Sequence, residues 1–166
     1  MPVLTRPLLL AAFLLPAAMA ATARDVAPEV QRPPGGTPQP VGQLHTLRNI
    51  PEACVRLEGQ FTGDAAAPYR MGATRHERCA LRALYVESSS LDKPASVASG
   101  WILNDRIGVA RADNPGCSAT IEVWRRPGDA APPALDAQGR SRIYLDKPQQ
   151  AAHPPMFTAV VATKGC

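Results

Sequence analysis

The sequence predicts an all-β protein, a small antiparallel β-sandwich or barrel stapled by two disulfides. Three observations support this fold class. Several short runs alternate apolar and polar residues with the period of a half-buried strand. Turns rich in Pro and Gly separate these runs, and the chain holds an even number of cysteines, four. The segment 75–87 also carries helical signals, and a helix there would change the class to α+β.

Residues 1–20 have the pattern of a secretory signal peptide. Arg6 precedes a short apolar run that ends at Pro16, and small residues then allow cleavage after Ala20 or Ala23. The apolar run is too short to span a bilayer, and the proline interrupts it. We therefore expect an exported chain, periplasmic or secreted, with no stable membrane insertion after cleavage.

The charge pattern is that of a solvated basic surface. The formal net charge of +4 includes Arg6, so cleavage of the leader would leave 17 − 14 = +3. The basic residues are scattered among acidic ones, which disfavours a dedicated anion site. An exported protein also meets little nucleic acid. We expect no nucleic-acid partner, and at most a weak attraction to anionic envelope polymers.

Residues 24–44 are rich in Pro and Gly and hold few large apolar side chains. Such a segment buries too little apolar surface to offset the entropy lost on ordering. We expect a flexible tether here, followed by a single globular β domain over 45–166. After leader cleavage the chain has about 145 residues, a length that suits one domain.

Cys54 to Phe61 is the first clear strand of this domain, after a start near 45–50. Its apolar face would hold Val55, Leu57, Gly59 and Phe61, and its polar face Arg56, Glu58 and Gln60. We expect a loop after it, because Pro68 and Gly72 interrupt the pattern.

The segment 75–87 carries conflicting signals. Thr74 and Glu77 fit a capping box, and the residues around Leu81 are good helix formers. The run is short, however, and its neighbours all predict strands. We expect a strand from about Cys79 to Val86, with the helix as the alternative.

Trp101 to Arg126 is predicted to be the central hairpin. Its first arm alternates apolar and polar residues, and its second arm does the same from Cys117 onward. The turn lies at Asn114-Pro115-Gly116. Because both tryptophans lie on this hairpin, we expect it to form the centre of the core. Strands are also predicted at 142–145 and at 156–163, the latter apolar enough to be covered on both faces.

Four cysteines in an exported chain predict two disulfides, for which three pairings exist. Antiparallel pairing of the strand that begins at Cys117 with the strand that ends at Cys166 would bring these two residues together. Cys54 then pairs with Cys79. The same register places Ile121 opposite Ala162 and Val123 opposite Val160.

The chain carries no established catalytic motif. The weak candidates for acid–base chemistry are His76, with Glu77 or Asp105 as its carboxylate partner. We expect the Asn104-Asp105 pair to form a turn. His76 and Cys79 have a ligand-like spacing, but no CxxC pair accompanies them and an oxidising compartment consumes thiols. We therefore expect no metal site and no cofactor.

The function we expect is that of a non-catalytic binding module of the bacterial envelope or extracellular space, such as an inhibitor or immunity-type protein. Its partner would be another exported protein or an envelope polymer. The candidate binding residues are Trp124, Arg125, Arg126 and Tyr144. Trp124 falls on the polar face of its strand, so it is exposed unless it covers a second layer. The alternatives are a small exported hydrolase that uses His76, and a structural envelope protein.

Overall fold

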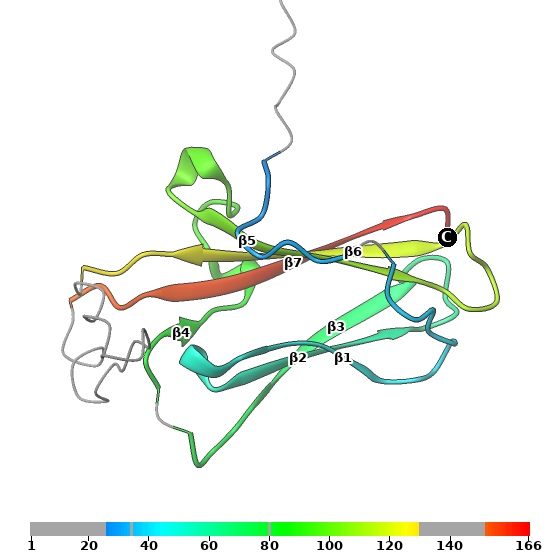
Figure 1. The fold of residues 1–166 in the computed structure, drawn as a ribbon, viewed down its shortest axis with the longest axis horizontal. Helices are drawn as coiled ribbons and strands as arrows, with labels where there is room; N and C mark the ends of the chain where they lie inside the picture. The colour runs from blue at the N-terminus through cyan, green and yellow to red at the C-terminus, as the bar shows by residue number, and fades with distance from the viewer. Residues whose placement is uncertain (1–25, 34, 80, 130–151) are drawn as a thin grey trace, which may run out of the picture.

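The computed structural model describes residues 26–33, 35–79, 81–129 and 152–166, and it confirms an all-β fold with two sheets (Figure 1). The first sheet has the order β1-β2-β3 and the second the order β4-β7-β6-β5. Every pairing is antiparallel except that of β4 with β7. The strands are β1 (His45–Ile50), β2 (Val55–Phe61), β3 (Tyr69–Arg75), β4 (Leu84–Tyr85), β5 (Ile102–Ala110), β6 (Ser118–Arg126) and β7 (Met156–Lys164).

The main core lies between the two sheets. The alternation predicted for β2 is confirmed, since its odd-numbered residues are buried and its even-numbered residues are half-buried. Three 3-10 turns complete the described elements: η1 (Pro51–Ala53), η2 (Ser88–Ser90) and η3 (Val97–Ser99). No helix in the described part of the chain is long and apolar enough to cross a membrane. The strand predicted at 142–145 lies outside the described residues.

A β-bulge in β5 divides the apolar residues of the hairpin between two cores. The pairing register of β5 with β6 shifts between Leu103 and Asp105, and a bulge changes which face the following side chains occupy. Ile107 and Val109 therefore join the main core. Trp101 and Leu103 instead join Trp124 in a second cluster. The prediction that both tryptophans lie at the centre of the main core was wrong.

Two neighbouring segments also differ from the sequence prediction. Neither a helix nor a strand from Cys79 to Val86 forms, since the described residues of 76–83 make turns and bends and β4 has two residues. The N–H groups of Arg82 and Ala83 donate to the Glu52 carbonyl beside η1, so they are not available to a ladder. Conversely β3 is a seven-residue strand where a loop was expected.

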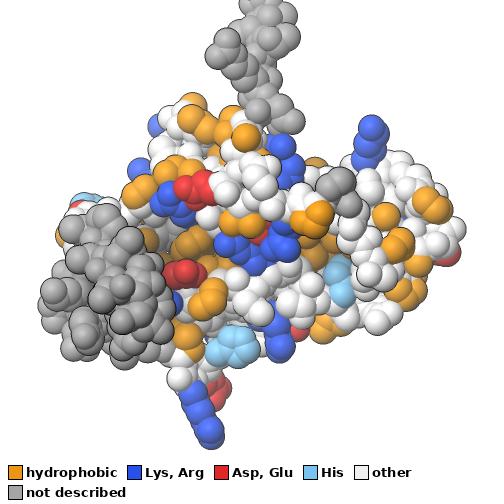
Figure 2. Space-filling view, in the orientation of Figure 1, with side chains coloured by type: hydrophobic (Ala, Val, Ile, Leu, Met, Phe, Trp, Pro, Cys, Tyr) orange, Lys and Arg blue, Asp and Glu red, His pale blue; other side chains and the backbone are white. Residues whose placement is uncertain are grey.

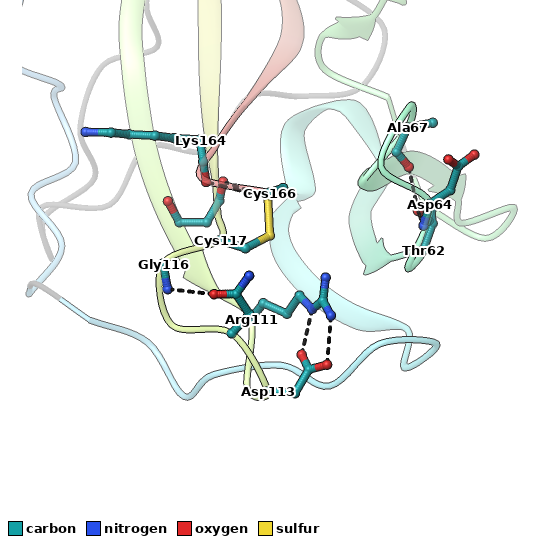
Figure 3. Close-up of a disulfide and its surroundings, with 11 residues drawn as sticks. Thr62, Asp64, Ala67, Arg111, Asp113, Gly116, Cys117, Lys164 and Cys166 are labelled. Atoms are coloured by element: carbon teal, nitrogen blue, oxygen red, sulfur yellow. Dashed lines mark hydrogen bonds and ion pairs between the residues drawn. A yellow bond between two sulfur atoms is a disulfide. The ribbon is translucent and has the colours of Figure 1, made fainter.

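Both predicted disulfides are confirmed, with Cα–Cα distances of 5.5 Å for Cys54–Cys79 and 4.3 Å for Cys117–Cys166. Figure 3 shows the second of these bridges. The register predicted for β7 was wrong by one residue, because Ile121 lies opposite Val161 rather than Ala162. A one-residue shift turns every side chain of a strand to the other face, and it places Phe157 and Ala159 in the main core.

The conformation of Gly165 reconciles this register with the Cys117–Cys166 bridge. Its φ of +68° belongs to the left-handed region, and a Cβ here would overlap the Gly116 carbonyl oxygen. The chain therefore passes directly over the hairpin turn after Lys164. In the β6–β7 register alone, Cys166 would not lie opposite Cys117. The close approach at Gly165 brings the two cysteines together.

Replacing Cys117 and Cys166 together by Ala should lower the free energy of unfolding by about 4 kcal/mol, since the bridge closes a sequence separation of 49. The matching Cys54→Ala, Cys79→Ala variant should lose about 3.5 kcal/mol, because its separation is 25. Urea unfolding of the oxidised variants measures both. An unchanged midpoint in the first variant would contradict the stabilising role assigned to this bridge.

Thr158→Val should raise the free energy of unfolding by about 1 kcal/mol. Thr158 is fully buried opposite Trp124, and its hydroxyl has no hydrogen-bond partner among the described residues. Valine keeps the branched shape and removes the unpaired polar group. Thr120→Val, on a half-buried site of β6, serves as the control and should change little. A loss of stability in Thr158→Val would show that the hydroxyl is satisfied in solution.

Candidate functional site: the two sides of the sandwich

The N-terminal segment closes one side of the sandwich (Figure 1, blue). Sequence composition predicted a free tether over 24–44, but the described part of this segment hydrogen-bonds to the edge of β5. The N–H groups of Glu29 and Val30 donate to Leu103 and Asn104, and that of Gln39 donates to Ala110. We call the described residues 26–33 and 35–42 the strap. It covers the backbone groups that an edge strand otherwise presents to solvent.

Asp105 holds the strap, β5 and β1 together. Its side chain is fully buried, and its carboxylate accepts hydrogen bonds from Arg32 of the strap at 2.8–3.1 Å. Arg48 of β1 donates to the same carboxylate at 2.8 Å. The hydrogen bond to Asp105 raises the pKa of Arg32 above its usual value. Figure 2 shows Lys and Arg side chains gathered with acidic ones near the centre of this face.

A second charged contact fixes the start of the strap. Glu29 accepts from Arg125 of β6 at 2.6 Å and from the Asn104 amide at 2.9 Å. The hydrogen bond from Arg125 holds the pKa of Glu29 below its ordinary value. Arg106 also donates to the backbone carbonyl of Val26. Charge-assisted hydrogen bonds, which are stronger than neutral ones, thus position the strap. They are made by four side chains of the sandwich: Asn104, Asp105, Arg106 and Arg125.

The described members of the predicted binding set do not share one environment. Trp124 was expected to be exposed unless it covers a second layer. It is 7% exposed and lies in the second apolar cluster, as the second of these alternatives expects. Arg125 is engaged by Glu29, whereas Arg126 is exposed at the end of β6. Tyr144 lies outside the described residues. Among the described residues, Arg126 is an exposed cation of β6 with no ion pair.

The candidate catalytic residues are not brought together either. His76 and Glu77 are exposed in the turn after β3. Asp105 was expected in a turn, but it lies buried within β5 and is already bonded to two arginines. Within the described ranges, the His76 ring has no hydrogen bond to a carboxylate or hydroxyl, and no group of three potential metal ligands gathers.

The opposite side of the sandwich is bordered by β3 and β7. Arg48–Asp105 sets β1 over β5, so the strand orders of the two sheets place β3 over the β7 side. A hydrogen bond from Arg75 at the end of β3 to the Tyr85 carbonyl of β4 agrees with this arrangement. We call this β3–β7 side the open side.

The phase of the ladders shows which backbone groups face outward on β3. The carbonyl of Pro68 accepts from Thr62, and the N–H of His76 donates to Cys54, so both groups point toward β2. Because these directions alternate along a strand, the N–H and C=O groups of Met71 and Ala73 point away from β2. No described residue pairs with them.

The edge of β7 is open over its C-terminal half. Val86 donates to the Phe157 carbonyl, so odd-numbered residues of β7 present their backbone groups to this side. β4 pairs only with Met156 and Phe157. Val161 and Thr163 therefore form a second unpaired edge within the described chain, and both residues are exposed.

Apolar side chains that face the interior are incompletely covered here. Val161 shares the face of Phe157 and Ala159, yet it is 38% exposed whereas Ala159 is 1% exposed. Met71 and Ala73 of β3 are half-buried against the main core. The core is thus closed on the strap side and reaches solvent between β3 and β7. Exposed apolar surface beside free strand edges is typical of a docking site.

Comparison of the chain with family models, with curated proteins and with solved structures finds no match. The interpretation of the site therefore depends on its geometry. The sequence contains no signal for the open side. Its strands have ordinary strand sequences, and the open side is defined by the lack of a pairing strand among the described residues.

Asp105→Asn should lower the free energy of unfolding by about 3 kcal/mol and release the strap, since two arginines lose a buried counter-charge. Amide exchange at Glu29 and Val30, whose N–H groups are bonded to β5, should accelerate. Asp113→Asn removes an exposed carboxylate bonded to Arg111 and should leave these amides unchanged. Unchanged exchange at Val30 in Asp105→Asn would show that the backbone bonds alone hold the strap.

Proposed function

We propose that this protein is an exported, non-catalytic binding module that binds another polypeptide along its open side. The observation that carries the proposal is the contrast between the two sides of the sandwich. The β5 edge is covered by the strap, whereas the β3 and β7 edges leave backbone groups and interior-facing apolar residues uncovered. Unprotected edges of this kind invite pairing with another chain.

Export is supported by the leader-like sequence of 1–20 and by the two disulfides, which suit an oxidising compartment. An oxidised domain gains rigidity from its bridges, and three of the four cysteines lie within two residues of a strand end. The binding surface is then a fixed pair of edges, which reduces the ordering cost of association.

A photo-reactive amino acid at Met71 tests this proposal in the cell that exports the protein. Met71 lies on the open edge of β3, so illumination should produce an adduct whose mass exceeds that of the chain by the mass of a polypeptide. The same probe at Ala112, an exposed residue of the β5–β6 hairpin, serves as the matched control. Adduct at neither position, or equal adduct at both, would contradict binding at the open side.

Ala73→Pro in the same experiment should abolish the Met71 adduct while leaving the fold intact. The N–H of Ala73 points away from β2, so proline removes a free donor and no ladder bond. Thr74→Pro is the structural control, since Thr74 faces Arg56 in the β2–β3 ladder and its loss should destabilise the domain. Persistence of the adduct in Ala73→Pro would show that strand pairing is not the mode of binding.

A further inference from the structure

We infer that the partner at the open side is an extended, acidic segment of another exported polypeptide, which adds to the first sheet as a strand beside β3. This inference rests on the proposed function and specifies the chemistry of the partner. It follows from three properties of the open side: its unpaired backbone groups, the faces of its side chains and its charge.

The backbone of β3 selects an extended chain. β3 pairs with β2 over seven residues without a register shift, so its free edge is a regular array of donors and acceptors. It contains no proline, and no described residue covers it. The other edge of this sheet, β1, has a bulge between Thr46 and Arg48. A regular, unprotected edge is the feature that strand addition uses.

The side chains that border the opening select an alternating pattern. Met71 and Ala73 point toward the interior of the sandwich, and Val161 lies on the interior face of β7 in the second sheet. A strand added beside β3 would turn every second side chain toward these three residues and the others toward solvent. Apolar residues at every second position would therefore cover the exposed part of Val161.

The charge of the two bordering strands selects an acidic partner. β3 and β7 together contain Arg70, Arg75 and Lys164, and neither strand contains an acidic residue. Glu58, on the adjacent β2, is already bonded to Arg56 and Thr74. Among the described residues, Arg70 and Lys164 form no ion pair. Lys164 lies on the outer face of the second sheet (Figure 3), whereas Arg70 lies on the outer face of β3. Carboxylates on the outward positions of the added strand would therefore meet the uncompensated charge of Arg70.

The same charges disfavour a second copy of the chain as the partner. Pairing of β3 or β7 with its own copy would gather the cations of both copies at one edge. Like charges that face each other across strands are destabilising. An acidic segment of a different polypeptide removes this repulsion and satisfies the same backbone groups.

Two synthetic peptides test the inference on the purified, oxidised protein. One alternates valine with glutamate, and the other alternates valine with lysine; both are capped and carry a fluorescent dye for anisotropy measurements. We expect saturable binding of the glutamate peptide and much weaker binding of the lysine peptide. A peptide with the composition of the glutamate peptide but with its valines clustered should bind poorly, because it cannot direct all its apolar side chains inward.

Charge reversal identifies the residues that provide the preference. Arg70→Glu should weaken binding of the glutamate peptide by about two- to five-fold, the range of exposed ion pairs. Lys164→Glu, on the outer face of the second sheet, should have a smaller effect. Arg70→Glu should also reduce the preference for the glutamate peptide over the lysine peptide. Lys93→Glu makes the same charge change on an exposed loop outside the open side and should have no effect. Ala73→Pro should abolish binding of both peptides.

Equal affinity for the two peptides, or no binding of either, would overturn the inference. The Met71 photo-adduct tests the proposed function independently of the peptides. A polypeptide adduct without peptide binding leaves the proposed function in place and removes the acidic-strand inference. An adduct with the mass of two copies of the chain would identify a second copy as the partner, which also overturns the inference.

Discussion

The buried carboxylate of Asp105 is the constraint on which the arrangement of this protein depends. It lies on β5 just after the bulge, and its two arginine partners come from the strap and from β1. A buried carboxylate without partners would be strongly unfavourable, so the three segments must meet. Their meeting sets β1 over β5, which closes one side of the sandwich and leaves β3 and β7 on the other.

The two sides therefore differ in the way their backbone groups are satisfied. On the closed side, the strap donates to carbonyls of β5 and its charged residues bind Arg125, Asn104 and Asp105. On the open side, the outward backbone groups of Met71, Ala73, Val161 and Thr163 face no strand in the described chain. An enzyme active site needs convergent polar groups, and the described polar groups converge on the closed side, where they already bond to one another. The binding role proposed for the open edges would use the backbone groups that no described residue pairs with.

Local patterns in the sequence were sufficient to predict most strands and both disulfides. The period-two alternation located β2, β5 and β6, and a nearly continuous apolar run located β7. The positions of Cys117 and Cys166 at strand ends indicated their pairing. The details that failed depend on single residues whose effect is not periodic. The bulge at Asn104 divided one predicted core into two, and the left-handed Gly165 allowed a register one residue away from that predicted.

Features that depend on distant contacts could not be predicted. β3 contains Gly72 and follows Pro68, so its pattern resembled a loop, and its regular pairing with β2 was needed to define it. The strap has the composition of a disordered segment, yet backbone bonds to β5 and the ion pair of Arg32 order it. The candidate site consists of strand edges that no described strand pairs with. The sequence of a strand does not show whether its edge is paired.

Residue-resolved amide hydrogen exchange of β3 in dilute, purified protein tests the central claim most directly. The account predicts an alternation along the strand, with rapid exchange at Met71 and Ala73 and slow exchange at Gly72 and Thr74, which lie in the ladder with β2. Addition of a bound strand should slow the first pair and leave the second unchanged. Equal protection at all four amides in the protein alone would contradict an open edge.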